Sequence, residues 1–126
     1  MQRQIVSGPS LPGQLGPYSH GVRAGGFLFV AGQAGIDDIG GAVGPTFGEQ
    51  ARQAFRNLDA VLRAGGSRPE LVVNTTVLVA DQAWFAELNE LFGDFFPNDP
   101  PARMVMQVPL PRGLLISIGC VAIVED

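Results

Sequence analysis

Short apolar runs separated by glycines begin the regular pattern of this chain. Residues 21–24 and 27–33 are rich in β-forming residues, and the pair Gly25-Gly26 lies between them. Glycine adopts positive φ without steric cost, so this spacing predicts two strands joined by the tight turn of a β-hairpin. Residues 7–16 carry many Pro and Gly residues and predict an irregular loop before the hairpin, and residues 36–48 predict a loop after it.

From residue 49 the apolar positions recur at steps of three and four residues, which indicates an amphipathic helix. Gly65-Gly66 predicts where this helix ends. A second helix is predicted after Asp81, whose side chain suits a helix N-cap, and Pro97 marks its end. The apolar stripes, which favour core packing over a cofactor site, are Ala51, Phe55, Leu58 and Leu62 in the first helix and Phe85, Leu88, Phe92 and Phe95 in the second.

Three further segments have the pattern of strands. Residues 71–80 form a continuous run rich in β-branched residues, which is typical of a strand covered on both faces. Residues 103–108 predict a short strand, and residues 114–124 predict a final strand with two largely apolar faces. The order β-β-α-β-α-β-β predicts one α+β domain over residues 1–126, a two-layer sandwich with two helices on one face of a mixed sheet. No segment is left to cover the other face, so we expect the chain to associate through its sheet.

Composition strengthens the expectation of an oligomer and narrows the range of partners. Only 16% of the 126 residues are charged, whereas about 25% is usual in soluble domains. The net charge is −4 and there is no basic run, which disfavours nucleic acids and anionic membrane surfaces as partners. The N-terminal residues lack the apolar stretch of a signal peptide, and the longest apolar run, residues 114–124, is too short to cross a bilayer.

Common catalytic motifs give little guidance. The chain contains no glycine-rich dinucleotide loop, no P-loop and no nucleophile elbow. His20 is the single histidine, which excludes multi-histidine metal sites, and a structural role is favoured over membership of a catalytic triad. Cys120 is the single cysteine, so neither a disulfide framework nor a cysteine-rich metal site can form within the chain, and a reducing compartment such as the cytoplasm is expected. Because Cys120 lies mid-strand among apolar residues, we expect an inert core residue.

Arg103 is the strongest candidate for binding chemistry. It follows the rigid segment Asn98-Asp-Pro-Pro-Ala102 and begins an apolar strand. Its planar guanidinium group suits a carboxylate, which it can bind through two parallel hydrogen bonds. An equally open interpretation is an ion pair with Asp99 or with a neighbouring chain.

Several separated segments resemble the Rid (YjgF/YER057c/UK114) family at matching spacing. The match covers nearly the whole chain, and the segments, each weak alone, are specific for the family together. They are Gly16-Pro-Tyr18, FVAGQ at residues 29–33 with Ala31 where Ser is common, QARQAFRNLDAVLRAG at residues 50–65, VNTTV at residues 73–77, residues 85–96 with Asn89 and Phe92 at characteristic places, and Pro101-Ala-Arg103.

The resemblance implies a chorismate-mutase-like fold and a homotrimer, with the sheets inside, the helices outside and a site in each cleft between two subunits. It implies an enamine/imine deaminase that hydrolyses reactive 2-imino acids, such as species derived from 2-aminoacrylate, to 2-keto acids and ammonia without a metal or organic cofactor. Arg103 would then be the catalytic residue that binds the substrate carboxylate, and the backbone of Gly32 would donate to the ligand. The side chains of Tyr18, Asn89 and Phe92 would line the cleft.

One position departs from the pattern of this family. Gly119 stands where active members often carry a Glu that is thought to orient the attacking water, and glycine has no side chain for that task. Cys120 is the next residue and could also face the predicted site, although strand alternation places it on the face opposite Gly119. Val105 stands where many members have Cys.

This departure keeps a second hypothesis open beside the deaminase. It is a non-catalytic trimer that binds or senses a small carboxylate or 2-keto acid in the same intersubunit cleft. A third hypothesis, a ribonuclease or translation inhibitor, follows names attached to some relatives and is disfavoured by the acidic net charge and the single histidine.

Overall fold

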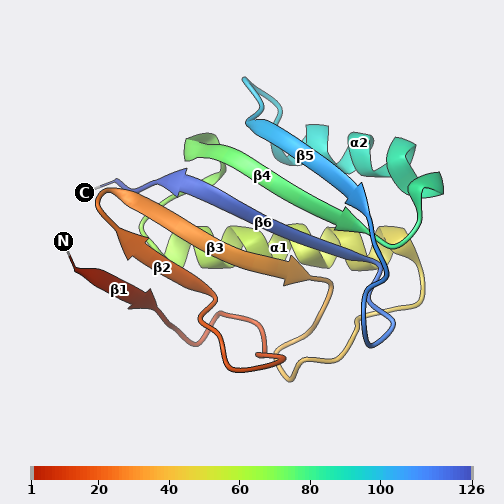
Figure 1. Ribbon diagram of the computed structural model, residues 1–126, viewed down its shortest axis with the longest axis horizontal. Helices are drawn as coiled ribbons and strands as arrows, with labels where there is room; N and C mark the ends of the chain where they lie inside the picture. Colours follow the sequence, from red (N-terminus) through yellow and green to blue (C-terminus); the bar gives the residue numbers. More distant parts are fainter. Residues whose placement is uncertain (1, 126) are drawn as a thin grey trace.

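The computed structural model describes residues 2–125, in which a curved sheet carries both helices on one face (Figure 1). The helices are α1 (Phe47–Ala64) and α2 (Phe85–Phe95), and two short 3-10 helices precede β4 and α2, namely η1 (Pro69–Leu71) and η2 (Gln82–Trp84). The strands are β1 (Arg3–Val6), β2 (Gly21–Ala24), β3 (Phe27–Ala34), β4 (Val72–Val79), β5 (Ala102–Gln107) and β6 (Ile116–Ile123).

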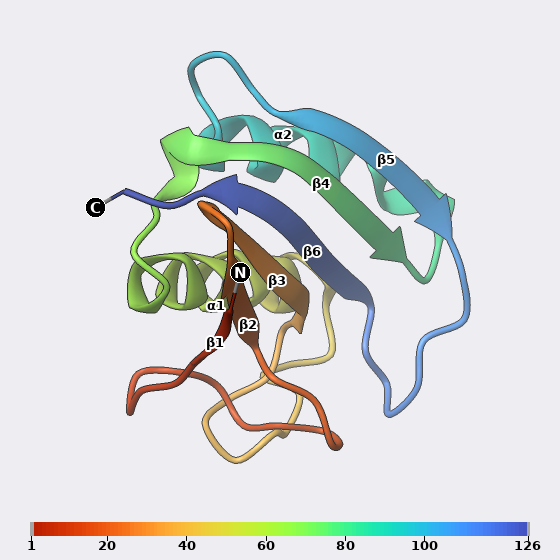
Figure 2. The same ribbon diagram turned by 60° about the vertical axis from the view of Figure 1, so that its left-hand side comes forward.

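The six strands lie in the order β1-β2-β3-β6-β4-β5. β4 and β5 run parallel and are connected through α2, whereas every other neighbouring pair is antiparallel. The sheet is therefore mixed, and the predicted two-layer α+β sandwich is confirmed. Figure 2 shows that α1 and α2 both lie behind the sheet and that β5 forms one of its edges.

The predicted element boundaries need four corrections. The N-terminal strand β1 was not expected, and it pairs with β2 through Ile5 and Val22. Helix α1 begins at Phe47, because the Thr46 side chain accepts a hydrogen bond from the Glu49 amide and caps the helix there. Asp81 caps η2 rather than α2, and β6 begins at Ile116, two residues later than expected.

The core lies between the sheet and the helices. Its fully buried side chains include Leu28, Leu58, Leu62, Val77, Leu88, Ile116 and Ile118. A smaller apolar cluster forms where the loops meet the end of β3, and it comprises Ala34, Ile36 and Leu114. In the segment that the structure describes, no helix combines the length and apolar character needed to span a membrane.

The other side of the sheet, which we call the open face, is uncovered and largely apolar. Residues 71–80 were expected to be covered on both faces, but Asn74 and Thr76 of β4 are exposed there, because the chain supplies no second layer. Phe29 is 48% exposed and Met104 is 58% exposed. The other large apolar side chains of the open face include Ile5, Phe27, Met106 and Ile123.

Candidate active site

Arg103 lies on the edge strand β5 and is held against α2. It pairs with Thr75 of β4, which is fully buried on the helix-facing side, and the Thr75 hydroxyl donates to the Ala102 carbonyl at 3.0 Å. The Arg103 guanidinium carbon lies 4.9 Å from the centroid of the Phe92 ring. Such a cation–π contact contributes about 0.5–1 kcal/mol at an exposed site. The aromatic ring therefore positions the guanidinium group without engaging its N–H donors in a hydrogen bond.

The alternative interpretation of Arg103, an ion pair with Asp99, is not what the structure shows. Within residues 2–125 Arg103 forms no salt bridge, and its side chain is exposed. Asp99 has a left-handed backbone with φ of 47° and precedes the rigid Pro100-Pro101 pair. This loop therefore leads into β5 without placing the Asp99 carboxylate against the Arg103 guanidinium group.

Asn89 completes the first of two groups of predicted site residues. It lies one turn before Phe92 on α2, and residues three apart share one side of a helix. Asn89 is exposed while Phe92 is buried. The helix-facing side of the edge strand therefore carries a cation from Arg103, an aromatic ring from Phe92 and an amide from Asn89. We call these three residues the arginine group.

The second group lies around Gly32. Tyr18 packs against His20, and the His20 ring is hydrogen-bonded to Gln33, the residue that follows Gly32. The Tyr18 ring packs edge-on against the His20 ring with 5.6 Å between the centroids. His20 Nε2 donates to the Pro12 carbonyl at 2.9 Å, and Nδ1 accepts from Gln33 Nε2 at 3.2 Å. A carbonyl can only accept, so Nε2 carries a proton. Both ring nitrogens are used, which supports the structural role predicted for this buried histidine.

Gly32 lies in a β-bulge of β3, where the pairing with β6 shifts register between Val30 and Gln33. This irregularity brings it close to Gly119. A Cβ atom built on Gly119 would lie 3.3 Å from the Val30 carbonyl oxygen and 3.6 Å from the Gly32 nitrogen. A Cβ atom on Gly32 would collide with the Ser117 hydroxyl. Gly32, Ser117 and Gly119 lie together on the open face, and we call them the glycine group. Tyr18 is linked to this group only through His20 and Gln33, the residue after Gly32.

The absent side chain of Gly119 leaves a shallow hollow of about 250 Å³ in the open face. Three polar side chains on this face, Asn74, Thr76 and Ser117, were missed by sequence reasoning. The sequence did carry a signal for these residues. Each is a polar residue at an outward-facing position of a strand whose other residues are mostly apolar. The hollow is lined by Phe29, Val30, Asn74, Thr76, Gly119, Cys120 and Val121.

Cys120 points away from the glycine group. It pairs with Thr75 on the helix-facing side and is buried among core residues. Burial raises the pKa of the Cys120 thiol to about 12, because an apolar environment penalises the thiolate. The thiol therefore stays protonated near neutral pH, as expected for an inert core cysteine.

A single chain does not bring the two groups together. β3 and β5 are separated by β6 and β4 (Figure 2), which corresponds to about 14 Å across the sheet. Arg103 also lies on the helix-facing side, whereas Gly32 and Gly119 lie on the open face. Each chain thus presents two separate halves of the predicted site.

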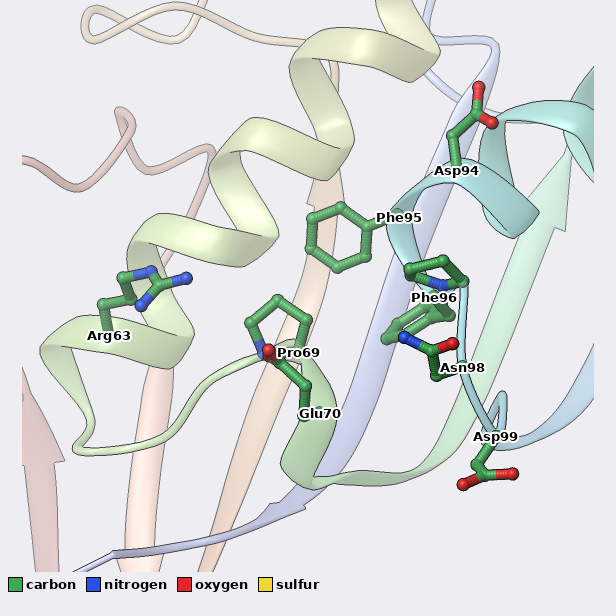
Figure 3. A pocket seen from close by; sticks show the side chains of 9 residues that line it. Arg63, Pro69, Glu70, Asp94, Phe95, Phe96, Asn98 and Asp99 are labelled. Atoms are coloured by element: carbon green, nitrogen blue, oxygen red, sulfur yellow. The ribbon is translucent and has the colours of Figure 1, made fainter.

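The helix side has a hollow of its own, of about 260 Å³, between the end of α1, η1 and the end of α2 (Figure 3). None of the predicted site residues lines it. Its rim carries Arg63, Glu70, Asp94 and Asp99, and its floor includes Phe95 and Phe96. No cluster of three or more His, Cys, Asp or Glu side chains within residues 2–125 is placed to hold a metal ion.

The fold is that of a small α+β protein, and its predicted site residues lie in two separate groups on the surface of one chain. Residues 9–124 match the family model of endoribonuclease L-PSP. The human 2-iminobutanoate/2-iminopropanoate deaminase is 39% identical, and the alignment covers 96% of this chain and 90% of that protein.

Solved structures agree with the sequence comparisons. RidA from an Antarctic Psychrobacter is 32% identical with a TM-score of 0.91, and the alignment covers 96% of this chain and 99% of that one. E. coli TdcF with bound serine is 29% identical with a TM-score of 0.88, over 97% of this chain and 99% of that one. The chain belongs to the endoribonuclease L-PSP family, which is the YjgF/Rid family.

Proposed function

We propose that this protein is an enamine/imine deaminase that hydrolyses small 2-imino acids to 2-keto acids and ammonia. The observation that carries the proposal is Arg103, which is supported by the Phe92 ring and forms no ion pair within residues 2–125. A guanidinium group held in this way suits a substrate carboxylate. The deaminase activity in the name of the human relative supports the same reaction, and the serine in E. coli TdcF is a small amino carboxylate.

The proposed site forms between two copies of the chain, in a homotrimer. The arginine group and the glycine group of one chain lie on opposite faces of the sheet, so a second copy is needed to bring them together. The open face supplies a reason for association, because its exposed apolar side chains have no cover within the chain. In this arrangement Arg103, Phe92 and Asn89 of one copy face Tyr18, Gly32 and Gly119 of the next.

The reaction needs little from the protein beyond positioning. Arg103 binds the carboxylate and fixes the adjacent C=N carbon, while the Gly32 backbone amide donates to the ligand. A water oxygen bonds to that carbon, the C=N electron pair moves to nitrogen, and a water proton follows it. The carbinolamine then loses its hydroxyl proton to nitrogen, the C–N bond breaks, and ammonia leaves with a keto acid behind. An imine is already electrophilic, so orientation supplies much of the rate gain.

The test couples an amino-acid oxidase, which generates imines, to semicarbazide trapping. Wild type should suppress semicarbazone formation, and Arg103→Ala should abolish this effect while retaining the fold. Arg56→Ala is the matched control, because Arg56 is an exposed arginine on α1 that binds Gln53. Equal imine decay with wild type and Arg103→Ala would refute the deaminase.

A second candidate, a non-catalytic binder of small carboxylates or 2-keto acids, is favoured by one observation. Gly119 offers no side chain to hold a water, and a hollow replaces it on the open face. Calorimetry with 2-oxobutyrate or pyruvate distinguishes the candidates: tight binding without turnover, lost in Arg103→Lys, would support the binder.

The ribonuclease named in the family description has weaker support in this chain. His20, the single histidine, is buried and its two ring nitrogens are held by Pro12 and Gln33. It is therefore not placed to exchange protons with an RNA substrate. A cytoplasmic location suits the proposed chemistry, since amino-acid metabolism generates imines there, and suits the free Cys120 thiol.

A further inference from the structure

We propose that the hollow on the helix side binds an alkylammonium group, which is a positively charged nitrogen at the end of an apolar chain. The hollow lies between the end of α1, η1 and the end of α2 (Figure 3). No residue of the arginine group or the glycine group lines it. The ligand is therefore distinct from the substrate of the proposed deaminase.

Aromatic and proline rings form the walls of the hollow. The rings of Phe95 and Phe96 are nearly perpendicular, with 88° between their planes and 4.8 Å between their centroids. Figure 3 shows the Phe95 ring directed from α2 into the hollow, toward Pro69 of η1. Phe96 is buried, whereas Phe95 keeps part of its surface exposed. The hollow thus offers an apolar surface for a carbon chain and an aromatic ring that attracts a cation.

The charges on the rim favour a cation over an anion. The rim carries the carboxylates of Glu70, Asp94 and Asp99 and the guanidinium group of Arg63. Arg63 Nε donates to Asp59 Oδ1 at 3.1 Å, so the charge of this arginine already has a partner. Within residues 2–125 the side chains of Asp94 and Asp99 form no ion pair and no hydrogen bond.

The other arginine near the rim is also paired. Arg68 donates to both carboxylate oxygens of Glu125, at 2.8 and 3.2 Å, and lies 3.9 Å from Glu70. Glu70 is therefore partly compensated, whereas Asp94 and Asp99 leave negative potential beside the aromatic wall. The hollow and the arginine group thus prefer ligands of opposite charge, so a substrate carboxylate would not compete for the hollow.

The size of the hollow limits the size of the ligand. Its volume of about 260 Å³ is below the roughly 300–1,000 Å³ of pockets that hold drug-sized molecules. An ammonium group on a short apolar chain suits this space, with the chain against Phe95 and Pro69 and the nitrogen beside Asp94 or Asp99. Free amines and the lysine side chains of partner proteins share this chemistry.

The experiment titrates three probes into the isotope-labelled full chain and follows the amide resonances by NMR. The probes are n-pentylamine, which is protonated at neutral pH, its uncharged analogue n-pentanol, and a capped peptide with one lysine among alanines. Pentylamine should saturate shifts at residues 69–70 and 94–99, and n-pentanol should bind about fivefold more weakly. Sodium chloride should weaken pentylamine binding, because the rim carboxylates are exposed. Saturation by the peptide as well would identify a lysine side chain as an occupant, and saturation by pentylamine alone would identify free amines.

Four variants test the location of the site. Asp99→Asn and Phe95→Leu should each weaken pentylamine binding about two- to fivefold, because they remove a carboxylate and an aromatic ring. Asn tolerates the left-handed backbone of residue 99, so Asp99→Asn should keep the fold. Asp38→Asn makes the same change at an exposed loop position and should bind like wild type. Arg63→Gln should bind at least as tightly as wild type, since it removes a cation from the rim.

Three results would overturn the proposal. Equal affinities for n-pentylamine and n-pentanol would show that the hollow recognises only apolar surface. Wild-type affinity in both Asp99→Asn and Phe95→Leu would place the amine elsewhere on the molecule. Weaker binding in Arg63→Gln would mean that the ligand contacts the guanidinium group and is not recognised as a cation. None of these results depends on imine hydrolysis, so each leaves the proposed deaminase intact.

Discussion

Cys120 illustrates how burial decides the chemistry of a single side chain. Its raised pKa of about 12 means that the folded protein keeps the thiol proton in a pH range where the unfolded chain releases it. The folded state then binds more protons than the unfolded state, so the free energy of unfolding must fall as pH rises. This loss is confined to the interval between the ordinary thiol pKa and about 12.

We therefore predict that Cys120 makes the protein sensitive to alkali. Urea unfolding of wild type and Cys120→Ala at about pH 8 and about pH 10.5 measures the effect. The wild type should lose more stability than Cys120→Ala between these two pH values, because the variant has no thiol to ionise on unfolding. A difference between the two proteins that stays constant with pH would contradict the prediction.

The contact between Gly32 and Ser117 predicts a coupling that is independent of any activity. Gly32 does not have positive φ, so Ala is compatible with its backbone, and the obstacle is the Ser117 hydroxyl. Gly32→Ala should cost about 1 kcal/mol more in the presence of Ser117 than in a Ser117→Ala background. Thermal or urea unfolding of the four proteins in this cycle gives the coupling energy, and additive effects would show that the two side chains do not meet.

Helix α1 is tied to the rest of the molecule by one buried amide as well as by its apolar stripe. Gln50 Nε2 donates to the carbonyls of Gly44 at 2.9 Å and Gly113 at 3.1 Å. Its Oε1 accepts from the Leu115 amide at 2.8 Å. A single side chain thus connects α1 to the loop before it and to the start of the last strand.

Gln50→Leu should lower the free energy of unfolding by about 2–4 kcal/mol, because it leaves buried backbone groups without partners. Gln53→Leu is the matched control on the same helix. Gln53 is half-buried and bonds only to Asn57 and Arg56 of α1, so its loss should cost less than about 1 kcal/mol. Similar losses of stability in both variants, measured by urea unfolding, would contradict the role of Gln50.

Elements with a strong local pattern could be predicted from the sequence, and those made by pairing could not. The stripe of α1 and the alternation of β6 follow from periodicity alone. β1 is short and mostly exposed, and it exists because it pairs with β2, which no local signal reports. The start of α1 depends on Thr46, whose hydroxyl accepts from the Glu49 amide and donates to the Glu49 carboxylate. The periodicity predicts a start at Glu49, because it does not register this cap.

The same distinction holds for the candidate site. Arg103 could be predicted from its residue type and its place after the proline pair, and Tyr18, Gly32, Asn89 and Phe92 from the family resemblance. The proximity of Ser117 to Gly32 depends on the register shift in β3, which is set by pairing across the sheet. The division of the site into two groups likewise depends on strand order. The sequence predicts the strands but does not show that β6 and β4 lie between β3 and β5.

The whole molecule has one covered and one uncovered sheet face, and in the homotrimer that we propose this asymmetry links assembly to the proposed activity. The open face carries exposed apolar side chains around a hollow, which is unfavourable for an isolated chain in water. The arginine group and the glycine group also lie too far apart to act on one small ligand within a chain. Association through the open face would cover the apolar surface and complete the site in the same step.

A charge placed on the open face should therefore abolish both assembly and activity. Phe29 is 48% exposed at the centre of this face, and Phe29→Asp would bury a carboxylate without a partner on association, at a cost of several kcal/mol. Light scattering after size-exclusion chromatography should show the mass of three chains for wild type and of one chain for Phe29→Asp, which should also lose imine hydrolysis. Ile39→Asp makes the same kind of change at a loop residue that is 87% exposed and lies outside the sheet, so it should retain the wild-type mass and activity. An active single-chain Phe29→Asp would contradict an intersubunit site, because the two groups could not then meet.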